Sequence, residues 1–164
     1  MELIYLDELK KVVADFVEQF GCKSEMNTDF AYYPNEQIIT WSIFMTEKSD
    51  RYFQKYVNKA FPDIEADSFL WSLLHEIGHH MTYNEWTEEK LDLLKATKAD
   101  AELKAKKPET EKLGYYLYFT AEDEWHATTW AAEYMRENSE EVKNFWLKFV
   151  EVYNNFLLIN KIDF

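Results

Sequence analysis

Cysteine is almost absent from this sequence, since Cys22 is the only one among 164 residues. A single thiol cannot form a disulfide within the chain, and it leaves no second thiolate for a cysteine-based zinc site. Any metal that the chain binds must therefore be held by histidine and carboxylate side chains.

Long apolar segments are absent as well. The first seven residues, MELIYLD, lack the basic segment and the uninterrupted apolar run of a signal peptide. Nowhere do 18 consecutive apolar residues occur, so no transmembrane helix is expected. We therefore expect a cytoplasmic protein.

Basic residues are few compared with acidic ones, because 18 lysines and arginines face 31 aspartates and glutamates, a net charge of -13. Such a charge repels nucleic acids and anionic membranes and attracts basic surfaces. We expect no direct contact with nucleic acid or membrane, and a basic protein is the favoured partner or substrate. Acidity can also serve solubility alone.

The sequence does contain the material for a hydrophobic core. Hydrophobic residues make up 47% of the chain and aromatic residues 18%, which argues against disorder. A chain of 164 residues fits one domain. We therefore predict a single domain over residues 1–164, with an exposed helical insertion at about 87–107.

The first part of the chain shows helical and then strand-like patterns. Apolar residues recur at helical spacing over residues 6–20, and Gly21 follows where a left-handed cap is wanted. Residues 29–44 are rich in aromatic and β-branched side chains around a Pro-Asn-Glu turn, which predicts a β-hairpin. A short helix is expected at 50–60, ended by Phe61-Pro62.

A second helical pattern follows in the middle of the chain. Asp63 or Asp67 can cap a helix that runs to about Tyr83 and is apolar on several sides, which is typical of a central helix. Residues 87–107 are rich in lysine and glutamate, and this predicts a mostly exposed helix that Pro108 terminates.

The last part of the chain is predicted to be mainly helical. Residues 114–119 form a short aromatic segment, interpreted as extended or irregular. Thr120-Ala121-Glu122-Asp123 has the form of a capping box and predicts the start of a helix. Asn138 or Ser139 can cap a final helix, whose sustained apolar period predicts a core-facing element. The fold class is therefore α+β, mainly helical, with a small antiparallel sheet packed over the central helix.

The central helix contains His75-Glu76-Ile77-Gly78-His79, an HExxH motif. Residues four apart lie on one helix face, so both histidines can present a nitrogen to one ion at about 2.0 to 2.1 Å. Glu76 is turned by about 100 degrees from His75, which keeps it out of the ligand set but within reach of a water as general base. Gly78 indicates that another backbone segment approaches closely.

A catalytic zinc site needs a third protein ligand and an open position. The helix after residue 120 offers Glu124 and His126, which lie about 200 degrees apart and cannot both face one metal. Small residues share the face of Glu124 and permit close packing near Gly78: Ala127, Thr128 and Ala131. This favours Glu124 over His126. Other acids also stay open as ligands: Glu122, Asp123 and Glu133.

These features resemble the ImmA/IrrE metallopeptidases. The likeness covers about residues 28–135 and rests on the HExxH helix, the preceding hairpin and a later helix that reads Glu124-x-x-Ala127-Thr128-x-Trp130-Ala131-Ala132-Glu133. The later motif of the family runs roughly E-x-E-A-N-x-[FW]-A-x-E. Here His126 stands where a second glutamate is common and Thr128 replaces asparagine. The gap from His79 to Glu124 is longer than usual, which the helix at 87–107 can explain.

The resemblance implies a zincin-like fold with zinc as cofactor, His75, His79 and Glu124 as ligands and Glu76 as catalytic base. It also implies intracellular cleavage of a regulator, typically a repressor of a phage or mobile element. Several polar side chains are candidates for stabilising an oxyanion: Tyr83, Tyr115, Tyr116, Tyr118, His80 and His126.

The charge also permits a function of another class. An acidic interaction protein could occupy a nucleic-acid-binding surface and block it, with a structural or vestigial zinc site. That function does not explain HExxH, because a structural site needs no glutamate beside its ligand and normally closes all four positions. A zinc hydrolase with a non-peptide substrate is a third alternative.

Overall fold

The computed structural model describes residues 3–43 and 48–161 and has the predicted α+β, mainly helical fold. The elements are α1 (Leu6–Glu18), β1 (Lys23–Met26), β2 (Ala31–Tyr33), β3 (Ile38–Trp41), α2 (Lys48–Ala60), α3 (Ser68–Thr82), η1 (Tyr83–Glu85), α4 (Glu88–Ala105), α5 (Glu111–Phe119), α6 (Glu122–Glu137) and α7 (Ser139–Ile159). No helix in the described ranges is both long and apolar enough to cross a membrane.

The sheet contains the predicted hairpin and one further strand. β2 pairs with β3 in antiparallel register, with Tyr33 opposite Ile38, so the hairpin is confirmed. Phe44, its predicted last residue, lies outside the described residues. β1 pairs with β3 in parallel, with Lys23 opposite Ile38, which makes the sheet mixed and leaves β2 at one edge.

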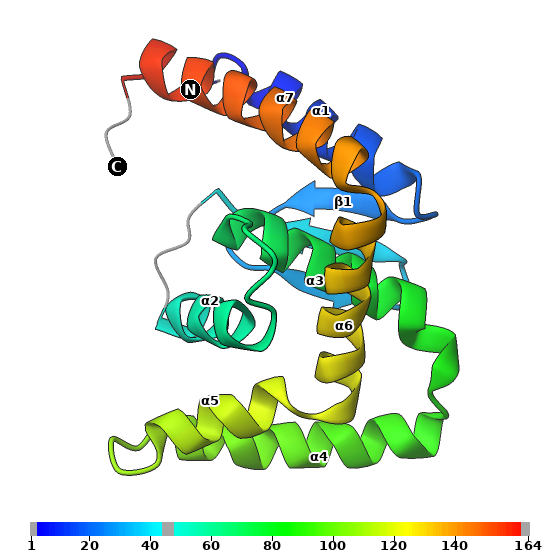
Figure 1. Ribbon diagram of the computed structural model, residues 1–164. Helices are drawn as coiled ribbons and strands as arrows, with labels where there is room; N and C mark the ends of the chain where they lie inside the picture. Colours follow the sequence, from blue (N-terminus) through cyan, green and yellow to red (C-terminus); the bar gives the residue numbers. More distant parts are fainter. Residues whose placement is uncertain (1–2, 44–47, 162–164) are drawn as a thin grey trace.

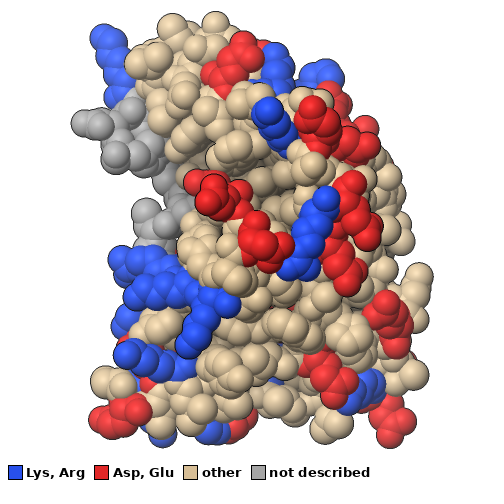
Figure 2. All heavy atoms as spheres, in the orientation of Figure 1, with Lys and Arg blue, Asp and Glu red and all other residues tan. Residues whose placement is uncertain are grey.

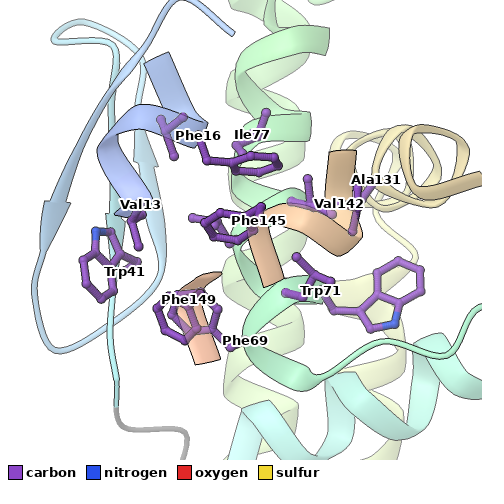
Figure 3. Packing of buried hydrophobic residues seen from close by; sticks show 14 of the residues in the cluster. Val13, Phe16, Trp41, Phe69, Trp71, Ile77, Ala131, Val142, Phe145 and Phe149 are labelled. Carbon is purple, nitrogen blue, oxygen red and sulfur yellow. The ribbon is translucent and has the colours of Figure 1, made fainter. Parts of the chain in front are cut away.

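The helix α3 lies in the middle of the molecule and crosses α6, while α1 and α7 run side by side beyond the sheet (Figure 1). The core between these elements is rich in aromatic rings (Figure 3). Phe16 of α1 stacks on Phe145 of α7 with ring centroids 4.1 Å apart, and Phe69 of α3 stacks on Phe149 at 4.3 Å. Such rings contribute large buried area, and the stack of Phe69 on Phe149 packs α3 against α7.

The ends of the first and central helices match the sequence pattern. Gly21 has φ of +82°, the left-handed conformation expected after α1. Asp67 caps α3, because its side chain accepts a hydrogen bond of 2.8 Å from the Phe69 N–H. The other candidate cap, Asp63, instead binds the Arg136 guanidinium.

The prediction that residues 114–119 are extended or irregular is wrong, because these residues belong to α5. Their aromatic rings have partners in other helices, as when Tyr115 stacks on Tyr52 of α2 at 4.4 Å. Gly114 permits contact with α4, since a Cβ there would lie 2.2 Å from the Ala105 nitrogen. Tertiary packing therefore outweighs the strand preference of aromatic residues.

The two polar side chains predicted to cap α6 and α7 do not form capping hydrogen bonds to these helices. α6 begins at Glu122, as expected, but the Thr120 hydroxyl donates to the Tyr116 carbonyl at 2.8 Å and does not cap the helix. Asn138 precedes α7, yet its side-chain amide donates to the Tyr134 carbonyl at 3.2 Å. Both side chains therefore complete the preceding helix.

Cys22 is expected to resist thiol reagents while the protein is folded. The residue is 5% exposed, and burial raises the pKa of its thiol to about 11, so about one thiol in a thousand is ionised at pH 8. Labelling at pH 8 with a thiol-reactive chromophore should be negligible without denaturant and should reach one label per chain in guanidinium chloride. Rapid labelling of the folded protein would contradict this burial.

Candidate metal centre

Three of the residues singled out in the sequence meet where α3 crosses the first turn of α6. The Nε2 atom of His75 lies 2.8 Å from Oε2 of Glu124, and the Nε2 atom of His79 lies 2.9 Å from the same oxygen. Their candidate ligand atoms all lie within 4.8 Å of one another. This group could hold a metal ion.

The chemistry of the group fits a small divalent cation. A tetrahedral ion with bonds of about 2.0 to 2.1 Å separates its ligand atoms by about 3.3 Å. The two His–Glu contacts of 2.8 and 2.9 Å are a few tenths of an ångström shorter than this separation, and all the candidate ligand atoms lie within 4.8 Å of one another. Two imidazoles and one carboxylate also leave a fourth position open.

Thr128 orients the first histidine. Its hydroxyl donates to the Glu124 backbone carbonyl at 2.9 Å, so its oxygen is left to accept from Nδ1 of His75 at 3.0 Å. With the proton on Nδ1, the Nε2 lone pair points at the Glu124 carboxylate. Two acceptors at 2.8 Å need a proton or a metal ion between them.

Gly78 allows the two helices to approach this closely. A Cβ at this position would lie 2.4 Å from the Ala127 carbonyl oxygen. The facing side chains of α6 are small and fully buried: Ala127, Thr128 and Ala131. The predicted close approach of another backbone segment to Gly78 is therefore confirmed.

The charges of the group are strongly coupled. Burial lowers the pKa of His79, but the nearby Glu124 carboxylate outweighs burial and raises it to about 9. Burial raises the pKa of Glu124, yet the two histidines hold it well below its ordinary range. Burial raises the pKa of Glu76 against the opposing effect of the same histidines. The surroundings of Glu124 therefore favour a cation.

The group lies in the wall of a cavity of about 970 Å³. His75, Glu76 and His79 of α3 all line it, and Glu76 is only partly buried. Other parts of the wall come from the edge strand β2 and from α2, α4, α5 and α6. The predicted base therefore faces a space large enough for a substrate.

Lys98 of α4 is a residue of the site that the sequence did not indicate. Its Nζ atom lies 2.6 Å from Oδ2 of Asp123 and 2.9 Å from Oε1 of Glu124. The Tyr118 ring packs beside it, with the ammonium 5.6 Å from the ring centroid. α4 is mostly exposed, as predicted, but the Lys98 side chain is only 17% exposed.

The other ligand candidates lie outside the group of His75, His79 and Glu124. His126 is exposed and its Nδ1 atom lies 3.0 Å from a carboxylate oxygen of Glu85. Asp123 faces Lys98, Glu122 forms a surface pair with Lys90, and Glu133 is exposed. Helix geometry therefore separates Glu124 from His126, as predicted.

The candidates for oxyanion stabilisation divide into two groups. Three line the cavity: Tyr83, Tyr115 and Tyr118. Tyr116 is 56% exposed, outside that lining. Nε2 of His80 lies 3.0 Å from the Phe20 carbonyl and Nδ1 lies 2.9 Å from the Tyr32 hydroxyl, so this histidine joins α3 to β2 and the end of α1.

Similarity to known proteins adds nothing to this geometry. No protein-family model, no curated protein and no solved structure matches the chain. The resemblance to the ImmA/IrrE peptidases therefore stays a prediction. What the described residues establish is a buried group of His75, His79 and Glu124 that could hold a metal ion.

Proposed function

We propose that this chain is a zinc-dependent peptidase, with His75, His79 and Glu124 as metal ligands and Glu76 as general base. The observation that carries the proposal is the convergence of both Nε2 atoms on one Glu124 oxygen, within 2.9 Å, beside a cavity that Glu76 also lines. Two imidazoles and a carboxylate are the protein ligands of a well-known class of catalytic zinc sites.

Bound zinc would supply a Lewis acid that polarises a carbonyl group and acidifies water. Glu76 follows His75 directly and faces the cavity, so its carboxylate can take a proton from the attacking water and pass it to the leaving nitrogen. Thr128 keeps the Nδ1 proton of His75 in place and so directs Nε2 towards the ligand position.

The edge strand supports a peptide as the substrate. Among the described residues β2 pairs with β3 on one side only, and its residues Ala31 and Tyr32 line the cavity. The free side of an edge strand offers backbone N–H and C=O groups to an extended chain. A peptide bound there would run along the wall that faces α3.

The charge of the cavity supports a basic substrate. Several acidic side chains line it besides those of the metal centre: Asp29, Asp50, Glu88, Asp92 and Glu102. Lys95 and Lys98 are the lysines in this lining, and Lys98 is paired with Asp123 and Glu124. A lysine- or arginine-rich segment of an intracellular DNA-binding regulator, the substrate class that the ImmA/IrrE resemblance implies, suits such a wall.

A blocker of nucleic-acid-binding surfaces is less well supported by the charge distribution on the face that Figure 2 shows. Figure 2 shows lysine and arginine side chains gathered on one side of the visible face, over α2, and acidic side chains spread over the other. The exposed basic residues of α2 are Lys48, Arg51, Lys55 and Lys59. An acidic mimic of nucleic acid needs a continuous face of one sign.

Zinc content tests the proposed centre directly. After dialysis against zinc and then against metal-free buffer, mass spectrometry of the wild-type protein should find one zinc per chain. His75→Ala, His79→Ala and Glu124→Ala should each lose this stoichiometric zinc, because two protein ligands seldom retain it.

His126→Ala is the matched control, since this histidine lies outside the group. It should keep one zinc per chain. A wild-type protein without zinc would overturn the proposal. Zinc that persists in all three ligand variants would overturn it as well.

A further inference from the structure

We infer that Lys98 is a positioning residue of the metal centre: its ammonium holds one oxygen of Glu124 so that the other faces His75 and His79. This inference rests on the proposed function, because it concerns the third ligand of the same site. It assigns a role to α4, a helix that the sequence marks only as an exposed insertion.

The two oxygens of Glu124 have different partners. Oε1 lies 2.9 Å from the Lys98 ammonium, whereas Oε2 lies 2.8 and 2.9 Å from the two histidine nitrogens. Because Oε1 is occupied by a charge-assisted hydrogen bond, only Oε2 is available to an ion between the histidines. Glu124 should therefore bind the metal through one oxygen.

Lys98 is itself held in place. Asp123 Oδ2 lies 2.6 Å from its Nζ atom, and the Tyr118 ring covers it from α5. The side chains of Asp123 and Glu124 are 8% and 7% exposed, so neither carboxylate rotates freely in solvent. A buried pair with this geometry fixes the direction of the Glu124 carboxylate before a metal arrives.

Lys98 also offsets a buried negative charge. The Asp123 carboxylate lies 2.6 Å from the Lys98 ammonium, and the Asp123 side chain is 8% exposed. Without the lysine, Asp123 would be a buried carboxylate with no counter-ion. Lys98 thus compensates for Asp123, which has no other described ion pair.

Replacement of Lys98 should have two opposite effects on zinc affinity, one through the charge of the ammonium and one through the position of the Glu124 carboxylate. A neutral residue at position 98 abolishes the repulsion between an ammonium and the incoming zinc ion, which by itself tightens binding. It also frees the Glu124 carboxylate, which weakens binding. We expect positioning to dominate, because loss of residues that hold metal ligands typically weakens metal affinity by roughly tenfold to 100-fold.

The test compares Lys98→Met with Lys90→Met. Lys90 is the matched control, because it also joins α4 to the first turn of α6, through Glu122, but its side chain is 37% exposed against 17% for Lys98. Zinc affinity is measured by competition with a chromophoric chelator, and cobalt(II) absorption reports the coordination number. Lys98→Met should bind zinc about tenfold to 100-fold more weakly, while Lys90→Met should match the wild type. The cobalt band of Lys98→Met should be weaker, since a freed carboxylate binds through both oxygens.

A double variant guards against misfolding. Lys98→Met with Asp123→Asn removes one charge of each sign, so the fold avoids an unpaired buried carboxylate at Asp123. It should show the same weakening of zinc binding and the same cobalt spectrum. Wild-type affinity and spectrum in a folded Lys98→Met or double variant, or tighter binding in either, would overturn the inference. A wild-type chain that binds no zinc would instead overturn the proposed function.

Discussion

Glu76→Gln is expected to abolish measurable peptide hydrolysis while the protein keeps its zinc. Glutamine has nearly the shape of glutamate but cannot accept the proton of the attacking water. Loss of a general base typically lowers the rate by about 10² to 10⁴-fold. Glu76 lies outside the group that could hold the metal, so zinc content should stay at one per chain. The measurement is kcat/KM on a fluorescence-quenched peptide library rich in lysine and arginine.

Glu102→Gln serves as the control for this variant. Glu102 also lines the cavity, and its replacement makes the same change of charge away from the histidines. It should alter KM for basic peptides and leave kcat within a few-fold of the wild-type value. If Glu76→Gln hydrolyses the peptides as fast as the wild type, Glu76 is not the base and the mechanism fails.

Much of the site can be predicted from the sequence, because a helix has a fixed period of 3.6 residues per turn. His75 and His79 are four positions apart and so lie on one helix face, and Glu124 shares its face with the small residues that permit contact with α3. The structure confirms both relations, since Glu124 meets the histidines and His126 points elsewhere. Helical periodicity therefore predicts that His75 and His79 share a face and favours Glu124 over His126, and tertiary packing completes the group that could hold a metal ion.

Lys98 and Thr128 could not be assigned in the same way. Lys98 is one lysine in a lysine- and glutamate-rich helix, and only the docking of α4 against α6 shows which of them is buried. The sequence predicts only that Thr128 is small enough for close packing, because its hydrogen bond to His75 depends on how α3 and α6 cross. Such supporting residues are determined by tertiary contacts, which a single sequence does not reveal.

The elements of the fold also differ in how well local periodicity predicts them. Periodic segments such as α1, α3 and α7 were predicted, because their burial repeats along the chain. β1 was missed, since its four residues alternate between exposed and half-buried positions and include two charged side chains. α5 was misassigned because its aromatic residues prefer strands, and its helical form depends on partners in α2 and α4.

Gly78→Ala is expected to destabilise the fold and weaken the metal centre together. In a helix this exchange alone stabilises by about 1 kcal/mol. Here the new Cβ would lie 2.4 Å from the Ala127 carbonyl oxygen, on backbone that cannot rotate away. α3 and α6 must separate, and overpacking of this kind costs about 3 kcal/mol. The net loss of about 2 kcal/mol should lower the melting temperature by about 4 to 8 °C for a chain of this size.

Zinc affinity separates this effect from a general loss of stability. Gly78 lies between His75 and His79, so separation of the helices also withdraws both histidines from Glu124. Gly114→Ala is the control, because its Cβ would meet the Ala105 nitrogen at 2.2 Å where α5 packs on α4. Both variants should melt earlier, but zinc binding should weaken mainly in Gly78→Ala. A higher melting temperature for Gly78→Ala would mean that α3 and α6 do not pack backbone to backbone. It would also contradict the proposed geometry of the metal centre, which depends on that contact.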